Sequence, residues 1–105
     1  MTGVFALIVS LRIRPEKRDR FLAAAEANST ASVRDEPGCV RFDVVVDQAD
    51  PNHFFYYEVY VDEAAFDAHK KTPHYAKWRE AAAECVVEGG QQNTRCNMLV
   101  PREYR

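Results

Sequence analysis

The chain has 105 residues, 47% of them hydrophobic, and a formal net charge of −2. This length predicts a single domain, residues 1–105, with enough apolar side chains for a core. Basic residues form no cluster along the sequence, which excludes the electrostatic footprint of a nucleic-acid-binding protein. No apolar run reaches the ~18 residues of a membrane span, and the N-terminus has no secretion-signal pattern. We therefore expect a cytoplasmic protein whose partners include neither nucleic acid nor a membrane.

The first predicted strand is residues 4–14, where apolar side chains point to both sides over the first half. Because both sides are apolar, we expect both faces of the sheet to be covered at this strand. Residues 15–35 follow as a helix. Pro15 suits its first turn, and the helix ends at Glu36-Pro37-Gly38.

Residues 39–47 and 53–61 are predicted to form a hairpin, joined by a turn at residues 48–52. In the first of these strands the alternation places four apolar residues on one face: Val40, Phe42, Val44 and Val46.

The rest of the chain predicts a second helical region and a last strand. Asp62 is the expected N-cap of the helix, and Thr72-Pro73 interrupts it and starts a second segment. That segment is expected to end at Gly89-Gly90, and residues 92–100 form the last strand.

The element order βαββαβ predicts an α+β, ferredoxin-like fold, with a four-stranded antiparallel sheet and both helices on one face. The other face carries apolar residues of the first strand, and large exposed apolar patches are uncommon in monomers. We therefore expect a homodimer in which two sheets pair face to face as a dimeric α/β barrel. The alternative is a monomer with a partly apolar open face.

Several polar residues fall on faces that should be apolar, which is the main indication of a functional site. They are Asn28 and Ser32 on the first helix, Glu58 in the third strand and His69 on the second helix. Buried polar groups need partners or a ligand. We therefore expect a small-molecule pocket between helices and sheet. Its expected walls are aromatic, namely Phe42, Tyr75 and Trp78.

Each of these residues also has a structural interpretation. A lone histidine on an apolar helix face is usually a hydrogen-bonded core residue, and the pKa range of His69 is the main argument for a base. Glu58 either lines the pocket or faces the dimer contact and pairs with Arg41 or Arg95. Asn28 either faces the pocket or bonds to backbone, and His74 either lines the site or is exposed. The three cysteines form no ligand-like pair, so we expect reduced thiols and no metal site.

Four segments resemble the antibiotic biosynthesis monooxygenase superfamily, and in order and length the likeness covers nearly the whole chain. They are Glu36-Pro37-Gly38-Cys39, Arg41-Phe42-Asp43-Val44, Tyr57-Glu58-Val59-Tyr60 and the stretch from Ala68 to Tyr75. The resemblance implies a ferredoxin-like dimeric α/β barrel that works without a cofactor. That family includes oxygenases of quinols and aromatic polyketides, and a branch that isomerises a phosphorylated dione, autoinducer-2.

The resemblance implies two reactions that begin with removal of a proton in an apolar pocket. In the expected one, a cofactor-free monooxygenase deprotonates a quinol or polyphenol that then reacts with molecular oxygen. His69 is its base, and Asn28, Ser32 or Tyr56 holds the oxyanion. In the alternative, an isomerase, His69 or Glu58 removes a proton next to a carbonyl, and Lys70, Arg41 and the helix start at Thr72-Pro73 hold a phosphate. A third interpretation is a dimer that binds a small ligand without catalysis.

Overall fold

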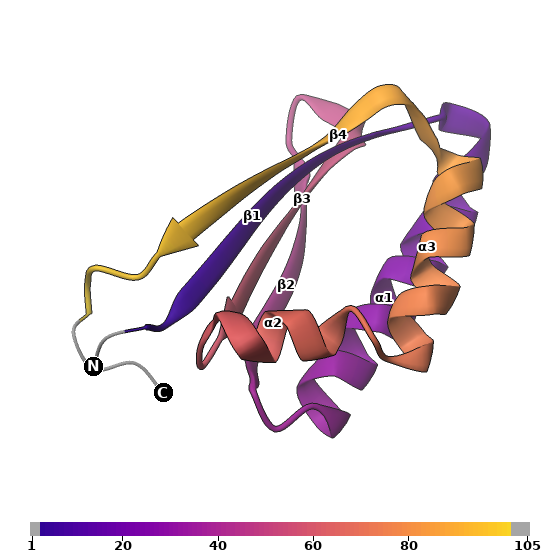
Figure 1. Cartoon of the computed structure of the whole chain (residues 1–105). Coiled ribbons are helices and arrows are strands. Elements are labelled where there is room, and N and C mark those ends of the chain that lie inside the picture. The colour runs from indigo at the N-terminus through magenta and orange to yellow at the C-terminus, as the bar shows by residue number, and fades with distance from the viewer. Residues whose placement is uncertain (1–2, 102–105) are drawn as a thin grey trace.

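The computed structural model describes residues 3–101 of the chain. Its elements follow the predicted order, with a short 3-10 helix η1 before the first α-helix and the second helical region divided into two (Figure 1). The bounds are β1 Phe5–Ile13, η1 Pro15–Lys17, α1 Arg18–Asp35, β2 Cys39–Asp47, β3 Asp50–Tyr60, α2 Glu63–His69, α3 Pro73–Cys85 and β4 Val86–Asn97.

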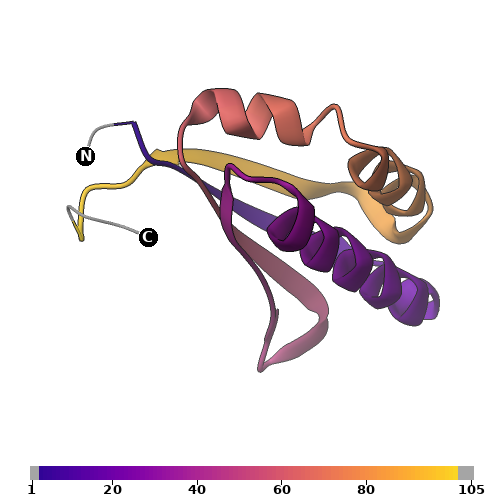
Figure 2. The same cartoon turned by 90° about the horizontal axis from the view of Figure 1, so that it is seen from below.

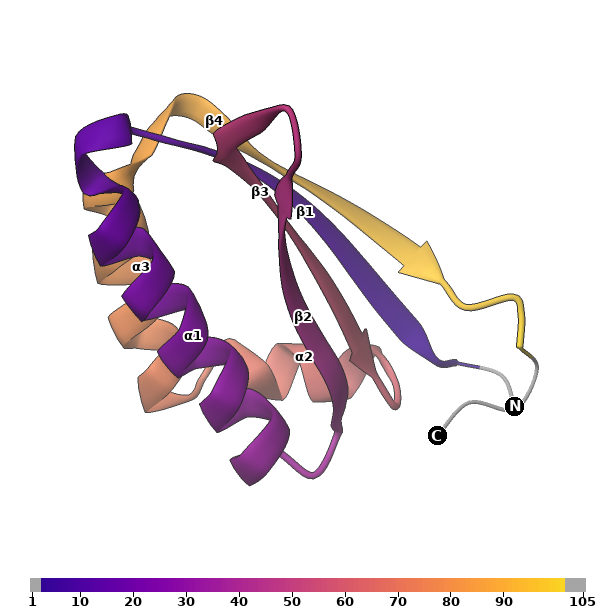
Figure 3. The ribbon, with the colours of Figure 1, turned by 180° about the vertical axis from the view of Figure 1, so that it is seen from behind.

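The four strands form one antiparallel sheet in the order β2-β3-β1-β4. All three α-helices lie on one side of it, and α1 and α3 run side by side (Figures 2 and 3). This confirms the predicted ferredoxin-like fold. Among the described residues, no helix is both long enough and apolar enough to cross a membrane.

Two predicted boundaries are wrong. The hairpin turn is confined to Gln48 and Ala49, and β3 already begins at Asp50. The turn is tight because the Asp47 carboxylate accepts a hydrogen bond from the Ala49 N–H at 2.8 Å.

The other wrong boundary is the end of the last helix. α3 ends at Cys85, and β4 starts directly at the β-branched Val86, because such residues favour strands. Gly89 and Gly90 therefore lie inside β4. There the register with β1 shifts, and Gly89 has a φ of 70°, which only glycine adopts readily.

The space between sheet and helices holds the main core. On its β1 side this core is built from Phe5, Leu7, Val9, Leu11 and Ile13, whose side chains all point towards the helices. A smaller cluster of Val4, Ala6 and Val59 lies on the opposite, open face of the sheet.

Val40 was predicted to share a face of the sheet with Phe42. This is wrong, because Val40 packs against the open-face cluster whereas Phe42 belongs to the main core. The cause is a register shift in β2, where Cys39 pairs with Tyr60 but Arg41 already pairs with Val59. One extra residue in a strand reverses the alternation that follows it.

Candidate functional site

A small cavity lies between the helices and the sheet, and the volume that the centre of a water molecule can occupy in it is about 30 Å³. The residues that line it come from β1, α1, β3, α2, α3 and β4. They are Leu7, Val9, Asn28, Tyr56, Glu58, Phe66, His69, Tyr75, Trp78, Gln91 and Asn93. The structure thus brings Asn28, Tyr56, Glu58, His69, Tyr75 and Trp78 together, as expected of one pocket.

His69 is buried, with 2% of its surface exposed, and one carboxylate fixes its orientation. Its Nδ1 lies 2.8 Å from Oε2 of Glu36, and Oγ of Ser32 lies 3.4 Å from the same nitrogen. The same Glu36 oxygen is 2.5 Å from Nε2 of His74. His74 therefore contacts the site through Glu36 and does not line the cavity itself.

The protonation of His69 follows from this geometry. Burial lowers the pKa of His69, and the hydrogen bond to Glu36 opposes that effect only in part. The ring is therefore neutral at neutral pH. Because Nδ1 faces a carboxylate oxygen, Nδ1 carries the proton and Nε2 keeps its lone pair. His69 thus offers the cavity an unprotonated nitrogen in a fixed orientation.

Glu58 faces this cavity, so the predicted alternative of a salt bridge to Arg41 or Arg95 is wrong. Arg41 pairs with Asp43, and Arg95 pairs with Glu63. The hydrogen bond that Glu58 accepts comes from the Tyr60 hydroxyl, at 2.7 Å. Burial raises the pKa of Glu58 to about 7, because a carboxylate loses hydration there. Glu58 can therefore hold a proton under conditions in which His69 is neutral.

Asn28 supplies an acceptor that the protein itself leaves unused. Its side chain is 2% exposed, and its Oδ1 is buried without a hydrogen-bond partner among the described residues. This oxygen therefore does not bond to backbone. Buried acceptors without partners are rare in folded proteins and mark places where a ligand group binds.

The aromatic walls are held in place by their own contacts. Trp78 Nε1 donates a hydrogen bond to the Tyr56 hydroxyl at 2.9 Å. Burial raises the pKa of Tyr56, so this hydroxyl stays protonated. Phe42 packs on the rings of Tyr56 and His69 from outside the cavity lining. Phe42 is therefore a support for the wall and not a part of it.

The predicted phosphate ligands do not meet at one place. Arg41 is paired in register with Val59, which belongs to the open face, so the sheet separates Arg41 from the cavity. At the first turn of α3, His74 is held by the Glu36 carboxylate, which disfavours an anion there. Lys70, by contrast, lies over the ring of the cavity residue Phe66, at 4.8 Å from its centre.

Three polar residues of the site, Glu36, Gln91 and Asn93, were not predicted from the sequence. Glu36 carries a detectable signal, since the C-terminal end of a helix favours cations and an acidic residue there needs a partner. Gln91 and Asn93 are alternate residues of β4 and therefore share a face. The strand was predicted to begin at residue 92, so Gln91 fell outside it and the shared face was not recognised.

Glu36, His69 and His74 are also the described residues that could hold a metal ion, since their ligand atoms lie within 4.8 Å of one another. Bonds of about 2.1 Å in a tetrahedral site place ligand atoms roughly 3.4 Å apart. The observed separations of 2.8 and 2.5 Å are shorter. The arrangement is therefore that of a hydrogen-bonded relay.

Two sequence relatives carry the name of one enzyme. An isomerase of (4S)-4-hydroxy-5-phosphonooxypentane-2,3-dione from Yersinia enterocolitica is 40% identical over 94 residues, which cover 90% of this chain and 96% of the relative. The enzyme of the same name from Klebsiella pneumoniae is also 40% identical, with 88% and 93% covered.

Solved structures agree with the fold. A Nitrosomonas europaea protein, provisionally described as an antibiotic biosynthesis monooxygenase, is 32% identical, has a TM-score of 0.89 and covers 96% of this chain and 95% of its own. Rv0793 from Mycobacterium tuberculosis is 25% identical, with a TM-score of 0.86 and coverages of 96% and 100%. The family model of the antibiotic biosynthesis monooxygenases matches residues 4–81. The chain therefore belongs to the antibiotic biosynthesis monooxygenase family.

Proposed function

We propose that this protein is an isomerase of a small phosphorylated dione, acting by proton transfer without an oxidant. The relatives at 40% identity support this reaction over the monooxygenase that was the first expectation. The observation that carries the proposal is the relation of two groups in one cavity, namely a neutral His69 oriented by Glu36 and a Glu58 with a raised pKa.

His69 is the proposed base. Its Nε2 takes the proton from the carbon that bears the substrate's hydroxyl group, next to a carbonyl. The electron pair of that C–H bond forms the new carbon–carbon double bond, and the carbonyl π electrons move to oxygen. Glu36 holds Nδ1–H at 2.8 Å and stabilises the imidazolium that forms.

Glu58 is the proposed acid, which gives its proton to the oxygen of the former carbonyl and yields an enediol. Asn28 Oδ1 accepts a hydrogen bond from a substrate hydroxyl, since the protein leaves this acceptor unpaired.

The second half of the reaction reverses these transfers one carbon away. Glu58 regains a proton from the original hydroxyl as it becomes a carbonyl, and protonated His69 delivers its proton to the former carbonyl carbon. All atoms and electrons are thereby accounted for, and no oxygen is consumed.

The test is to incubate the protein with (4S)-4-hydroxy-5-phosphonooxypentane-2,3-dione in D2O and follow carbon and proton NMR spectra. We expect the carbonyl to move by one carbon and deuterium to appear on the carbon that receives the proton. His69→Gln should lower kcat by roughly 100-fold or more, the usual contribution of a positioned base.

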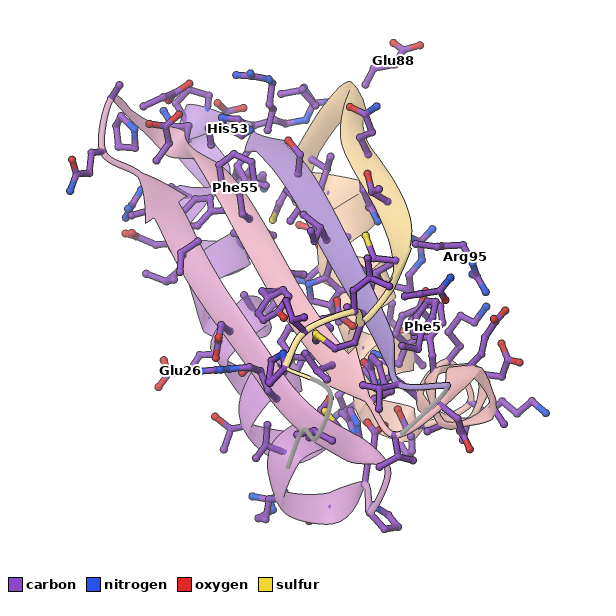
Figure 4. All side chains as sticks on the ribbon, turned by 90° about the vertical axis from the view of Figure 1, so that its left-hand side faces the viewer. Phe5, Glu26, His53, Phe55, Glu88 and Arg95 are labelled. Atoms are coloured by element: carbon purple, nitrogen blue, oxygen red, sulfur yellow. The ribbon has the colours of Figure 1, made fainter. Side chains whose placement is uncertain are left out.

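His53→Gln is the matched control, because His53 is also buried but lies on the open face of the sheet (Figure 4). It should retain wild-type kcat. Absence of both isomerisation and deuterium exchange in the wild type, or oxygen uptake with a reduced quinol, would contradict the proposal in favour of a binding protein or a monooxygenase.

A further inference from the structure

The cavity that holds His69 and Glu58 is poorly suited to a phosphate group. Among the described residues that line it there is no lysine or arginine. It contains the acidic Glu58, and burial keeps its histidine neutral. A phosphate dianion inside would lose its hydration without gaining a cation. The phosphate of a substrate must therefore lie outside the lining, where cations are within reach.

Two cations flank one wall of the cavity, the side chain of Phe66. The Arg95 guanidinium lies 5.5 Å from the centre of the Phe66 ring, and Lys70 Nζ lies 4.8 Å from it. Arg95 also lies 5.2 Å from the ring of Phe5. Both cations remain accessible, since their side chains are 49% and 40% exposed.

The sheet register sets the direction of Arg95. It pairs with Leu7 and lies two residues from Asn93, and both of these line the cavity. Alternate residues of a strand point to the same face and lie about 6.7 Å apart. Figure 4 shows Arg95 at the β4 edge, on the same side as Phe5. The guanidinium thus lies on the helix side of the sheet, beside the cavity lining and one strand repeat from Asn93.

We propose that Arg95, assisted by Lys70, binds the phosphate group of the substrate and leaves the dione to enter the cavity. This inference rests on the proposed function. In the unliganded protein, Arg95 is held by Glu63 and Lys70 by Asp67, and these carboxylates are 62% and 57% exposed. Exposed ion pairs contribute little stability, so a phosphate dianion, which Arg binds through two hydrogen bonds, can replace them.

The experiment compares wild type, Arg95→Gln and Arg34→Gln. Arg34 is the matched control, because it is also an exposed arginine paired with a carboxylate, that of Asp35, but it belongs to α1 and does not line the cavity. In Arg95→Gln we expect KM for the phosphorylated dione to rise roughly 10- to 100-fold. The value of kcat should stay within about threefold, the pattern of a lost uniform binding contact. With the unphosphorylated dione the three proteins should have equal KM.

A second measurement, independent of turnover, is calorimetric titration with inorganic phosphate. Wild type and Arg34→Gln should bind phosphate, and Arg95→Gln should lose at least about tenfold in affinity. Equal phosphate affinity in all three proteins, or an unchanged KM in Arg95→Gln, would overturn the inference even if the wild type isomerises the dione. A different outcome is that Arg95→Gln loses phosphate affinity but the wild type shows no turnover of the dione. That result would support the phosphate site at Arg95 and contradict the proposed isomerase function.

Discussion

Glu36 illustrates how a residue unfavourable for its helix becomes useful for the site. It is the C-cap of α1, where the helix dipole disfavours a carboxylate. Its carboxylate contacts two histidines of the α2–α3 region, His69 and His74, and these contacts offset the unfavourable position. The contact with His69 also fixes the tautomer of the proposed base.

The raised pKa of Glu58 predicts a pH-dependent stability. The pKa is about 7 in the folded protein and 4.5 in the reference state, so the folded state holds this proton more tightly. The stability from Glu58 is therefore complete below pH 4.5 and is lost as pH rises through 7. Glu58→Gln should thus be more stable than wild type at pH 8, by a difference on the order of 3 kcal/mol, and nearly equal to it at pH 4.

Urea unfolding at the two pH values measures this difference. Gln retains an oxygen that can accept the Tyr60 hydroxyl, so packing is largely preserved. A stability difference that is the same at both pH values would contradict the assigned protonation. The variant should also lose activity, because Gln cannot donate a proton as an acid.

At the scale of the element, α3 depends on Thr72 for its start. Thr72 accepts a hydrogen bond from Tyr75 N–H at 3.2 Å and donates one to the His69 carbonyl at 2.8 Å. Pro73 follows at the first helical position, where its missing N–H has no cost. This cap links the end of α2, which carries His69, to the helix that carries Tyr75 and Trp78.

Thr72→Ala should therefore destabilise the protein by about 1 kcal/mol, the typical effect of a lost N-cap. Thermal unfolding should show a Tm lower by roughly 4–8 °C. Thr30→Ala is the control, because Thr30 is exposed in the middle of α1. Equal Tm values for the two variants would show that the cap contributes nothing.

At the scale of the whole molecule, the open face of the sheet favours the predicted homodimer. It carries the cluster of Val4, Ala6 and Val59, and Ile8 is 43% exposed. Two polar groups of this face already bond to each other, since Ser10 Oγ lies 2.8 Å from His53 Nε2. Covering the face would thus bury apolar surface without leaving these two groups unpaired.

Ile8→Glu tests this assembly, because a charge in a buried interface is strongly unfavourable. We expect the wild type to sediment as two copies of the 12.0 kDa chain and the variant as one. Val33→Glu, at an exposed apolar residue of α1, should remain dimeric. A wild type that sediments as a monomer at micromolar concentration would reject the homodimer.

The sequence by itself determined the element order, the N-caps and the polar residues on apolar faces. These depend on local chemistry, namely the period of apolar residues, capping side chains and proline, so Asn28, Glu58 and His69 were recognisable. The tertiary structure decided what each group contacts. Glu36 contacts His69, which is 33 residues away in the sequence. A register shift in β2 puts Val40 and Arg41 on the open face of the sheet. Contacts between distant segments depend on register and packing, and no local pattern encodes either one.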